Sequence, residues 1–283
     1  MSSSLDQILQ KDFIETDREK TVGNYRLSSI LTSSRFSDVR LGFHLHHGHK
    51  VAVKCIKKLG KSRSQKQILL FKAEYKSLIS LKHRNIVKMY ETMVTADNMY
   101  LVLEYIDGKT LSALIKERCG LGEDMSRFLM YQLVTAVSYC HSNYIIHRDI
   151  KPSNIMVNRE LHVTLIDFGL SCNANQKECM TQSCGTPVYT APEVYLGIQH
   201  SFPRDVWSIG VVLYEMVSGC PPFFDLTTKH KNDIIENIHR KLFFPSHLTQ
   251  GCQDLLTKTL TICIKDRISI DDMLLHSWFK DVS

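Results

Sequence analysis

Strand-like and helix-like patterns are segregated along this chain, and that segregation limits the folds it can adopt. Short β-branched and apolar runs predict strands at residues 25–31, 39–43, 51–56 and 100–104, with a helix at residues 67–81 between them. Later in the chain helical spacing dominates, at residues 111–116, 125–142, 205–218, 229–240, 253–260 and 271–276. A strand-rich part followed by a helix-rich part favours an α+β fold of two lobes with a cleft between them.

Composition excludes several classes of protein. The 283 residues, 43% hydrophobic and 23% charged, are enough for a sizeable buried core and do not resemble a disordered chain. The nine cysteines include no CxxC pair, which disfavours a zinc site or a disulfide framework and favours free thiols. The chain shows no secretory signal and no stretch near the roughly 20 apolar residues of a membrane span. We therefore expect a cytoplasmic protein that binds no membrane.

Two further segments bear on partners. Basic residues gather at residues 57–66, but no aromatic residue is interleaved with them, so we expect a solvated face and no nucleic-acid partner. In the leader, residues 1–24, four apolar residues have helical spacing: Leu5, Ile8, Leu9 and Phe13. The leader is interpreted either as a partly ordered tail or as a segment that docks on the body or on a partner. We expect the protein to be a monomer.

The strongest local signal is HRDIKPSN at residues 147–154, followed by DFG at residues 167–169. Transfer of a phosphoryl group needs two oxygen atoms held in line and neutralisation of the charge on the group between them. Positioned carboxylates and cations are the parts that this chemistry requires. The two segments supply both.

These segments belong to an ordered set of motifs. VAVK at residues 51–54 and Glu74 precede them, and APE at residues 191–193 and DVWSIG at residues 205–210 follow. The set resembles the eukaryotic protein kinase family over residues 25–279, and SCGTP, GCPPF and HSWF resemble its calmodulin-dependent and AMP-activated group. The resemblance implies a two-lobed protein kinase fold with ATP and Mg²⁺ between the lobes.

The resemblance also implies a division of the chain and an activity. A protein kinase domain is expected at residues 25–283 after the leader, with the small lobe at residues 25–106 and the large lobe at residues 107–283. The implied activity is that of a serine/threonine protein kinase, which transfers the γ-phosphoryl group of ATP to a hydroxyl of a protein substrate.

Single residues acquire implied roles in the same way. Lys54 matches the lysine that contacts the α- and β-phosphates, and Glu74 matches the glutamate that holds this lysine. Asp149 matches the carboxylate that orients or deprotonates the substrate hydroxyl, and Lys151 matches the lysine that steadies the transferred phosphate. Thr186 in CGTP matches the threonine that bonds both, and with Lys151 it resembles the serine/threonine branch.

Metal and nucleotide contacts follow from the resemblance too. Asn154 and Asp167 match the two magnesium ligands, an amide oxygen and a carboxylate, which are hard donors suited to that ion. Besides Lys54, the residues matched to nucleotide contacts are Leu31, Val39, Ala52, Leu103, Glu104, Ile106 and Met156. Apolar residues at these positions also suit a core, so their contact with adenine is implied by the resemblance alone.

The segment at residues 31–39 departs from the family pattern G-x-G-x-x-G-x-V, because all three glycines are replaced, by Thr32, Ser34 and Ser37. Glycine lets backbone amides approach a phosphate closely and permits positive φ, so its loss should stiffen the loop and weaken nucleotide binding. The alternative function is a pseudokinase that acts as a scaffold or allosteric partner. The retained lysine, base and metal ligands favour the enzyme.

The segment between Gly169 and Ala191 departs as well. Arg148 before Asp149 resembles kinases that are activated when a phosphate in this segment pairs with the arginine. Gln182 stands at the usual phosphothreonine position, flanked by Thr181 and Ser183. Either flanking residue would serve an upstream activating kinase, with Thr181 favoured, or Gln182 would hold the segment by hydrogen bonds without modification.

Overall fold

The computed structural model describes residues 15–16, 21–34, 37–58, 61–176, 180–198, 201–223, 238 and 242–280. The chain divides into two compact units, the first formed by Met1–Lys82 and Val87–Asp107 and the second by His83–Ile86 and Gly108–Ser283. The first unit is rich in strands and the second in helices, as the sequence predicts. The predicted helix at residues 229–240 and the apolar stripe of the leader lie outside the described residues.

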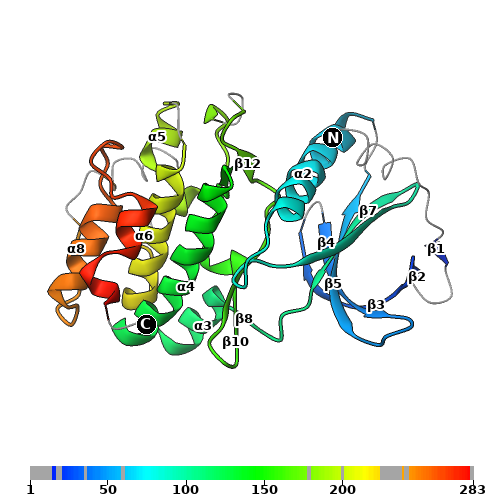
Figure 1. The fold of residues 1–283 in the computed structure, drawn as a ribbon, viewed down its shortest axis with the longest axis horizontal. Helices are drawn as coiled ribbons and strands as arrows, with labels where there is room; N and C mark the ends of the chain where they lie inside the picture. The colour runs from blue at the N-terminus through cyan, green and yellow to red at the C-terminus, as the bar shows by residue number, and fades with distance from the viewer. Residues whose placement is uncertain are drawn as a thin grey trace. The chain divides into compact units, whose positions relative to one another are not determined.

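The first unit is built on an antiparallel sheet with the strand order β1-β2-β3-β4-β5-β7-β6, seen in Figure 1. Its strands are β1 (Glu15–Thr16), β2 (Thr21–Val22), β3 (Tyr25–Ser33), β4 (Ser37–His44), β5 (Lys50–Lys57), β6 (Met89–Val94) and β7 (Asn98–Glu104). The four predicted strands are confirmed, each two or three residues longer in total than expected. The sequence analysis missed β6, because this edge strand buries only Met93 and Val94 and shows no clear alternation.

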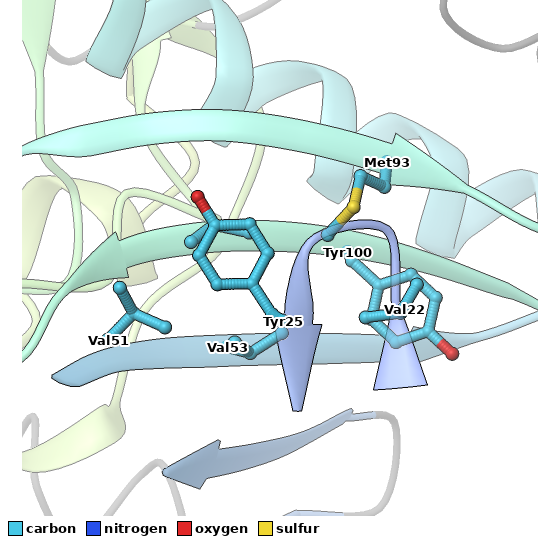
Figure 2. Packing of buried hydrophobic residues seen from close by; sticks show 7 residues of the cluster. Val22, Tyr25, Val51, Val53, Met93 and Tyr100 are labelled. Atoms are coloured by element: carbon cyan, nitrogen blue, oxygen red, sulfur yellow. The ribbon is translucent and has the colours of Figure 1, made fainter. Parts of the chain in front are cut away.

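One face of this sheet packs a small apolar core. Val51 and Val53 are fully buried on β5, and Val102 and Tyr100 lie beside them on β7. Figure 2 shows the side chains of this cluster, with Met93 approaching from β6. Because successive residues of a strand point to opposite faces, Ala52 and the residues in phase with it belong to the other face.

Helix α2 (Lys61–Ser80) belongs to the same unit and contacts β5 and β6. Phe71, Tyr75 and Leu78 are buried at spacings of four and three residues, which forms an apolar stripe along one side of the helix. The helix begins six residues before the predicted start at residue 67. Its first turns carry Lys61, Ser62, Arg63 and Ser64, which give no apolar periodicity for a pattern to detect.

The second unit contains helices α3 (Leu111–Arg118), α4 (Glu123–Ser142), α5 (Pro192–Tyr195), α6 (Pro203–Ser218), α8 (Gln250–Thr259) and α9 (Ile270–Leu274), most of them labelled in Figure 1. Short strands accompany them: β8 (Gly108–Thr110), β9 (Ile145–Ile146), β10 (Ile155–Asn158), β11 (Val163–Leu165) and β12 (Cys172–Asn173). Single 3₁₀ turns occur at η1 (Pro152–Asn154), η3 (Pro187–Tyr189) and η4 (Ser277–Phe279). Among the described helices, none has the length and apolar character required to cross a bilayer.

Helix α6 forms the centre of the second unit. It contacts α4 and α8, and nearly all of its side chains are buried, so it is apolar around most of its circumference. Gly210 allows α8 to approach closely, because a Cβ at this position would lie 2.6 Å from Thr259 Oγ1. A buried helix of this kind is a rigid base for the loops that contact its first turn.

An ion pair fastens α5 to the chain near α9. Arg267 donates two parallel hydrogen bonds to the Glu193 carboxylate, at 2.7 and 2.9 Å, and both side chains are almost completely buried. The guanidinium also donates to the carbonyl of Pro203 at 2.9 Å. Removal of one member of such a pair leaves an uncompensated charge in the interior.

We expect Arg267→Met to lower the free energy of unfolding by about 3–5 kcal/mol, because the Glu193 carboxylate would remain buried without its partner. The double variant with Glu193→Leu should recover much of that loss, since no charge is then left unpaired. Urea denaturation followed by circular dichroism measures both values. Equal stability of Arg267→Met and the wild type would contradict the assigned role of the pair.

Candidate active site

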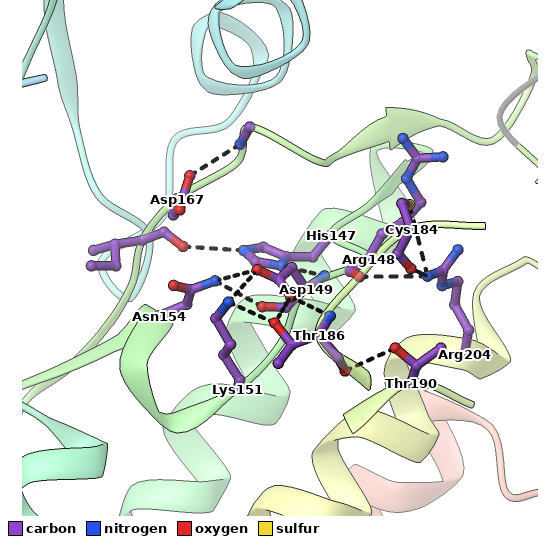
Figure 3. Close-up of polar contacts among 12 residues, drawn as sticks. His147, Arg148, Asp149, Lys151, Asn154, Asp167, Cys184, Thr186, Thr190 and Arg204 are labelled. Atoms are coloured by element: carbon purple, nitrogen blue, oxygen red, sulfur yellow. Dashed lines mark hydrogen bonds and ion pairs between the residues drawn. The ribbon is translucent and has the colours of Figure 1, made fainter. Parts of the chain in front are cut away.

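The carboxylate of Asp149 lies at the centre of a compact network in the second unit (Figure 3). Its Oδ1 accepts hydrogen bonds from the Thr186 amide at 3.0 Å and the Thr186 hydroxyl at 2.7 Å. Its Oδ2 lies 2.7 Å from Lys151 Nζ and accepts from Asn154 Nδ2 at 3.0 Å. Four donors from three residues therefore fix the orientation of this carboxylate.

Thr186 connects Lys151 to Asp149 as well. Its hydroxyl accepts a hydrogen bond from Lys151 Nζ at 2.7 Å and donates its own proton to Asp149. A hydroxyl can do both at once because it carries one donor and two acceptor lone pairs. The three residues that the sequence analysis grouped by resemblance thus form a closed triangle of contacts.

Asn154 and Asp167 come together at the ends of a hairpin. Strands β10 and β11 pair with Ile155 opposite Leu165, and the Ile166 amide donates to the Asn154 carbonyl at 2.9 Å. The Asn154 amide nitrogen donates to the carbonyl and the carboxylate of Asp149. Its Oδ1 therefore points away from Asp149, and no described residue donates a hydrogen bond to it. Such an oxygen suits a magnesium ligand.

Two residues of this region have left-handed backbone conformations that side chains other than glycine rarely adopt. Arg148 has φ of 68° and Asp167 has φ of 61°. Such conformations cost free energy and persist where the surroundings determine them strongly. For Arg148 the surroundings include the hydrogen bond from its amide to Asp205 Oδ1 at 2.9 Å.

Asp205, at the start of α6, holds the loop that carries Asp149. Its fully buried carboxylate accepts hydrogen bonds from the amides of His147 and Arg148 and from the ring of His141 at 3.0 Å. Burial opposes ionisation of this carboxyl, but the hydrogen bonds hold the pKa of Asp205 below its usual value. The sequence analysis noted Asp205 within a motif and gave it no role, although an acid followed by a mostly apolar helix was the available signal.

His147 completes the loop. Its Nδ1 accepts from the Asp149 amide at 3.3 Å, so the proton lies on Nε2, which donates to the Ile166 carbonyl at 3.2 Å. The ring also packs edge-on against Phe168, with centroids 4.7 Å apart. His147 thereby links the loop of Asp149 to the segment of Asp167.

In the first unit, Lys54 and Glu74 form an ion pair between β5 and α2. Lys54 Nζ lies 2.6 Å from Glu74 Oε2, and the two side chains are 12% and 1% exposed. Val51 and Val53 point to the apolar core, so Lys54 lies on the opposite face of β5. On this face Ala52 and Lys54 are only partly buried.

Three of the residues matched to nucleotide contacts share the face of Lys54. Val39 lies opposite Lys54, and Ala52 lies opposite Leu103, in the registers of β4, β5 and β7. Residues directly opposite in an antiparallel pair point to the same face. The structure therefore gathers these apolar side chains beside the Lys54 amine.

The remaining four residues of this set are placed differently. Leu31 is 46% exposed in an irregular part of β3, and Glu104 ends β7, where its amide donates to the Lys88 carbonyl at 2.8 Å. Ile106 lies in the segment between β7 and β8. Met156 belongs to the second unit, on β10, where it pairs with Thr110 and Thr164. Contact of these residues with a nucleotide stays a prediction.

The glycine-free loop between β3 and β4 is closed by its own hydrogen bonds. The Ser34 amide donates to the Ser37 carbonyl at 2.8 Å, and the Ser37 amide donates to the Ser34 hydroxyl at 3.1 Å. At its base, Asp38 accepts from the Ser33 hydroxyl at 2.5 Å and pairs with Lys57 at 3.2 Å. Two backbone amides are thus engaged within the loop itself.

We expect Asp205→Asn to destabilise the protein at neutral pH by about 3 kcal/mol or more, because it removes a buried charge that binds three donors. A carboxyl with a lowered pKa in the folded state contributes stability above its unfolded pKa of about 3.9, and this contribution is lost as pH falls through the folded value. The difference in unfolding free energy between wild type and variant should therefore shrink below that pH. Denaturation at several pH values measures it, and a constant difference would contradict the assignment.

Comparison with known proteins shows the family of this chain. The family model described as protein kinase domain matches residues 25–279. The SNF1-related protein kinase catalytic subunit alpha KIN12 of Arabidopsis thaliana is 35% identical over 91% of this chain and 52% of the relative. The SNF-related serine/threonine-protein kinase of Homo sapiens is 36% identical over 93% of this chain and 34% of the relative. The carbon catabolite-derepressing protein kinase of Secale cereale is 35% identical over 94% of this chain and 53% of the relative.

The chain spans between about a third and about half of the length of these curated relatives. Protein kinase domains typically use ATP and Mg²⁺ and act on protein substrates. The resemblance found in the sequence motifs is confirmed over the same residues, 25–279. The chain has the protein kinase fold and belongs to the protein kinase family, as a relative of the SNF1-related serine/threonine kinases.

Proposed function

We propose that the chain is an active serine/threonine protein kinase that transfers the γ-phosphoryl group of ATP to a hydroxyl of a protein substrate. The observation that carries the proposal is the closed triangle of Asp149, Lys151 and Thr186. A carboxylate held by several donors keeps one orientation, which is what a group that accepts or orients a hydroxyl proton needs.

Each residue has one part in the proposed reaction. Asp149 orients the acceptor hydroxyl and takes its proton, and Lys151 balances negative charge beside it. In the first unit, Glu74 holds the Lys54 amine at 2.6 Å so that it binds phosphate oxygens. Within each unit these charged groups are already held in place by their contacts, so they need no rearrangement there during the reaction. Such preorganised positioning is the main source of catalysis in phosphoryl transfer.

Asn154 and Asp167 are the proposed magnesium ligands. No group of three His, Cys, Asp or Glu residues in the described ranges converges as a ready metal centre. Magnesium in kinases is bound by one or two protein ligands together with phosphate oxygens and water, so an amide oxygen and one carboxylate fit it. The ion supplies neutralisation of the charge on the transferred group.

The acceptor class follows from the contact between Lys151 and Thr186. This pair resembles the serine/threonine branch, and a curated relative carries serine/threonine-protein kinase in its name. A protein substrate with a serine or threonine acceptor is therefore the proposed partner.

We further propose a kinase domain at residues 25–283, divided near residue 106, and an upstream kinase that acts on Thr181.

A second candidate function is a pseudokinase that acts as a scaffold or allosteric partner. The self-closed loop favours it, because the amides of Ser34 and Ser37 are bonded within the loop and are not presented to an anion. The enzyme remains the better-supported proposal, since the contacts around Asp149 have no evident use in a scaffold.

We expect Asp149→Asn to reduce phosphoryl transfer by about 10²–10⁴-fold, because the proton acceptor is lost. Nucleotide binding should be retained. Transfer of labelled phosphate from magnesium ATP to a serine/threonine peptide library measures the first, and fluorescence titration with an ATP analogue measures the second. The matched control is Asp124→Asn, whose carboxylate is 97% exposed on α4. A wild type without transfer, even after treatment with an activating kinase, would favour the scaffold.

We expect the double variant Ser34→Gly and Ser37→Gly to bind ATP about 2- to 10-fold more tightly, because a hydrogen bond of about 0.5–1.5 kcal/mol from the Ser37 amide to the Ser34 hydroxyl is removed and that amide becomes available. The control is Ser29→Gly, an exposed serine of β3. Calorimetric titration with magnesium ATP compares the three proteins. Equal or weaker affinity of the double variant would show that the loop bonds do not oppose binding.

A further inference from the structure

Arg204, in the first turn of α6, has a side chain that joins two separate segments. Its Nη2 donates to the Cys184 carbonyl at 2.7 Å and to the Arg148 carbonyl at 3.5 Å, as Figure 3 shows. Arg148 directly precedes Asp149, and Cys184 lies two residues before Thr186. One guanidinium therefore bridges the loop of Asp149 and the segment that carries its hydrogen-bond donor.

The location of Arg204 is unfavourable for a cation in other respects. The residue is 3% exposed, and no described carboxylate lies within 4.0 Å of its guanidinium. Its Nη1 has no hydrogen-bond partner among the described residues. The first turn of a helix also carries partial positive charge, which repels a cation. No ion pair explains why Arg204 is buried, so we attribute its position to the two hydrogen bonds that it donates to backbone carbonyls.

The bridged segments also pack closely at Gly185, which has φ of +116°. A Cβ there would lie 2.9 Å from the Arg148 carbonyl oxygen and 3.1 Å from Thr190 Oγ1. The Thr190 hydroxyl in turn donates to the Thr186 carbonyl at 2.9 Å. The backbone at Gly185 thus lies against the loop of Asp149 with no room for a side chain at that position.

We propose that Arg204 is a positioning residue that ties the segment of Cys184 to the loop of Asp149 and so keeps Thr186 bonded to Asp149. The proposal rests on the proposed kinase activity. It also gives the segment an anchor that needs no phosphate, at a place where Gln182 occupies the position of the phosphorylated threonine of similar kinases. A guanidinium on a rigid buried helix is permanently charged, whereas a phosphate has to be added.

The kinetic test compares Arg204→Met, which keeps the length of the side chain and removes every donor, with Arg204→Lys, which keeps a charged donor. We expect Arg204→Met to lower kcat by about 10- to 100-fold, as for loss of a charge-assisted hydrogen bond, with an unchanged KM for ATP. Arg204→Lys should restore part of kcat. The matched control is Arg159→Met, an exposed arginine in the turn between β10 and β11.

Two outcomes would overturn the proposal: Arg204→Met with the kinetics of Arg159→Met, or Arg204→Lys as impaired as Arg204→Met. Phosphatase treatment of the wild type adds a third arm, in which unchanged exchange of the Thr186 amide supports an anchor without phosphate and faster exchange contradicts it.

Hydrogen exchange gives a reading that does not depend on catalysis. The Thr186 amide, which donates to Asp149, should exchange faster in Arg204→Met than in Arg159→Met. Gly185→Ala provides a second variant if Arg204→Met does not fold, because its Cβ would lie 2.9 Å from the Arg148 carbonyl oxygen and 3.6 Å from Arg204 Nη2 and would displace the same segment, and it should show the same faster exchange. Equal exchange in all proteins would refute the tether, whereas faster exchange in a chain without transfer activity would refute only the kinase.

Discussion

The buried carboxylate of Asp205 is the interaction on which the second unit depends. Burial of this charge among apolar side chains would be strongly unfavourable if it had no partners. It is stable there only because His141 and two backbone amides donate hydrogen bonds to it. Those amides belong to His147 and Arg148, so the requirement of one buried charge fixes the path of the loop that carries Asp149. The strained φ of Arg148 is tolerated for the same reason.

Backbone geometry then places the other residues of the candidate site relative to the loop of Asp149. The loop leads through η1 into β10, and the pairing of β10 with β11 sets Asn154 beside the segment of Asp167. The segment at Thr186 closes the network from the other side. The first unit uses a different device: a strand with two chemically distinct faces, one apolar and one bearing Lys54.

Sequence patterns predicted the parts of this molecule that repeat a periodicity or a motif. A short β-branched and apolar run predicts the strand of Val51 and Val53, and helical spacing predicts the helix of Phe71. The motif residues Asp149, Lys151 and Thr186 were grouped correctly as neighbours, although their chemical roles stay proposals. Edge strand β6 escaped because it buries only two side chains. Asp205 and Arg204 escaped because the contacts of a buried charge depend on segments far away in the chain.

The closed loop of Ser34 and Ser37 has a consequence for competition among ligands. A molecule that uses the loop amides has to break hydrogen bonds that the protein already makes, and its apparent affinity falls by the fraction of open loop. A molecule that contacts only the apolar side chains of Val39, Ala52 and Leu103 beside Lys54 leaves those bonds intact. If the chain acts as the proposed kinase, base-like inhibitors without phosphates should therefore displace nucleotide from it at lower concentrations than from a kinase whose loop retains its glycines.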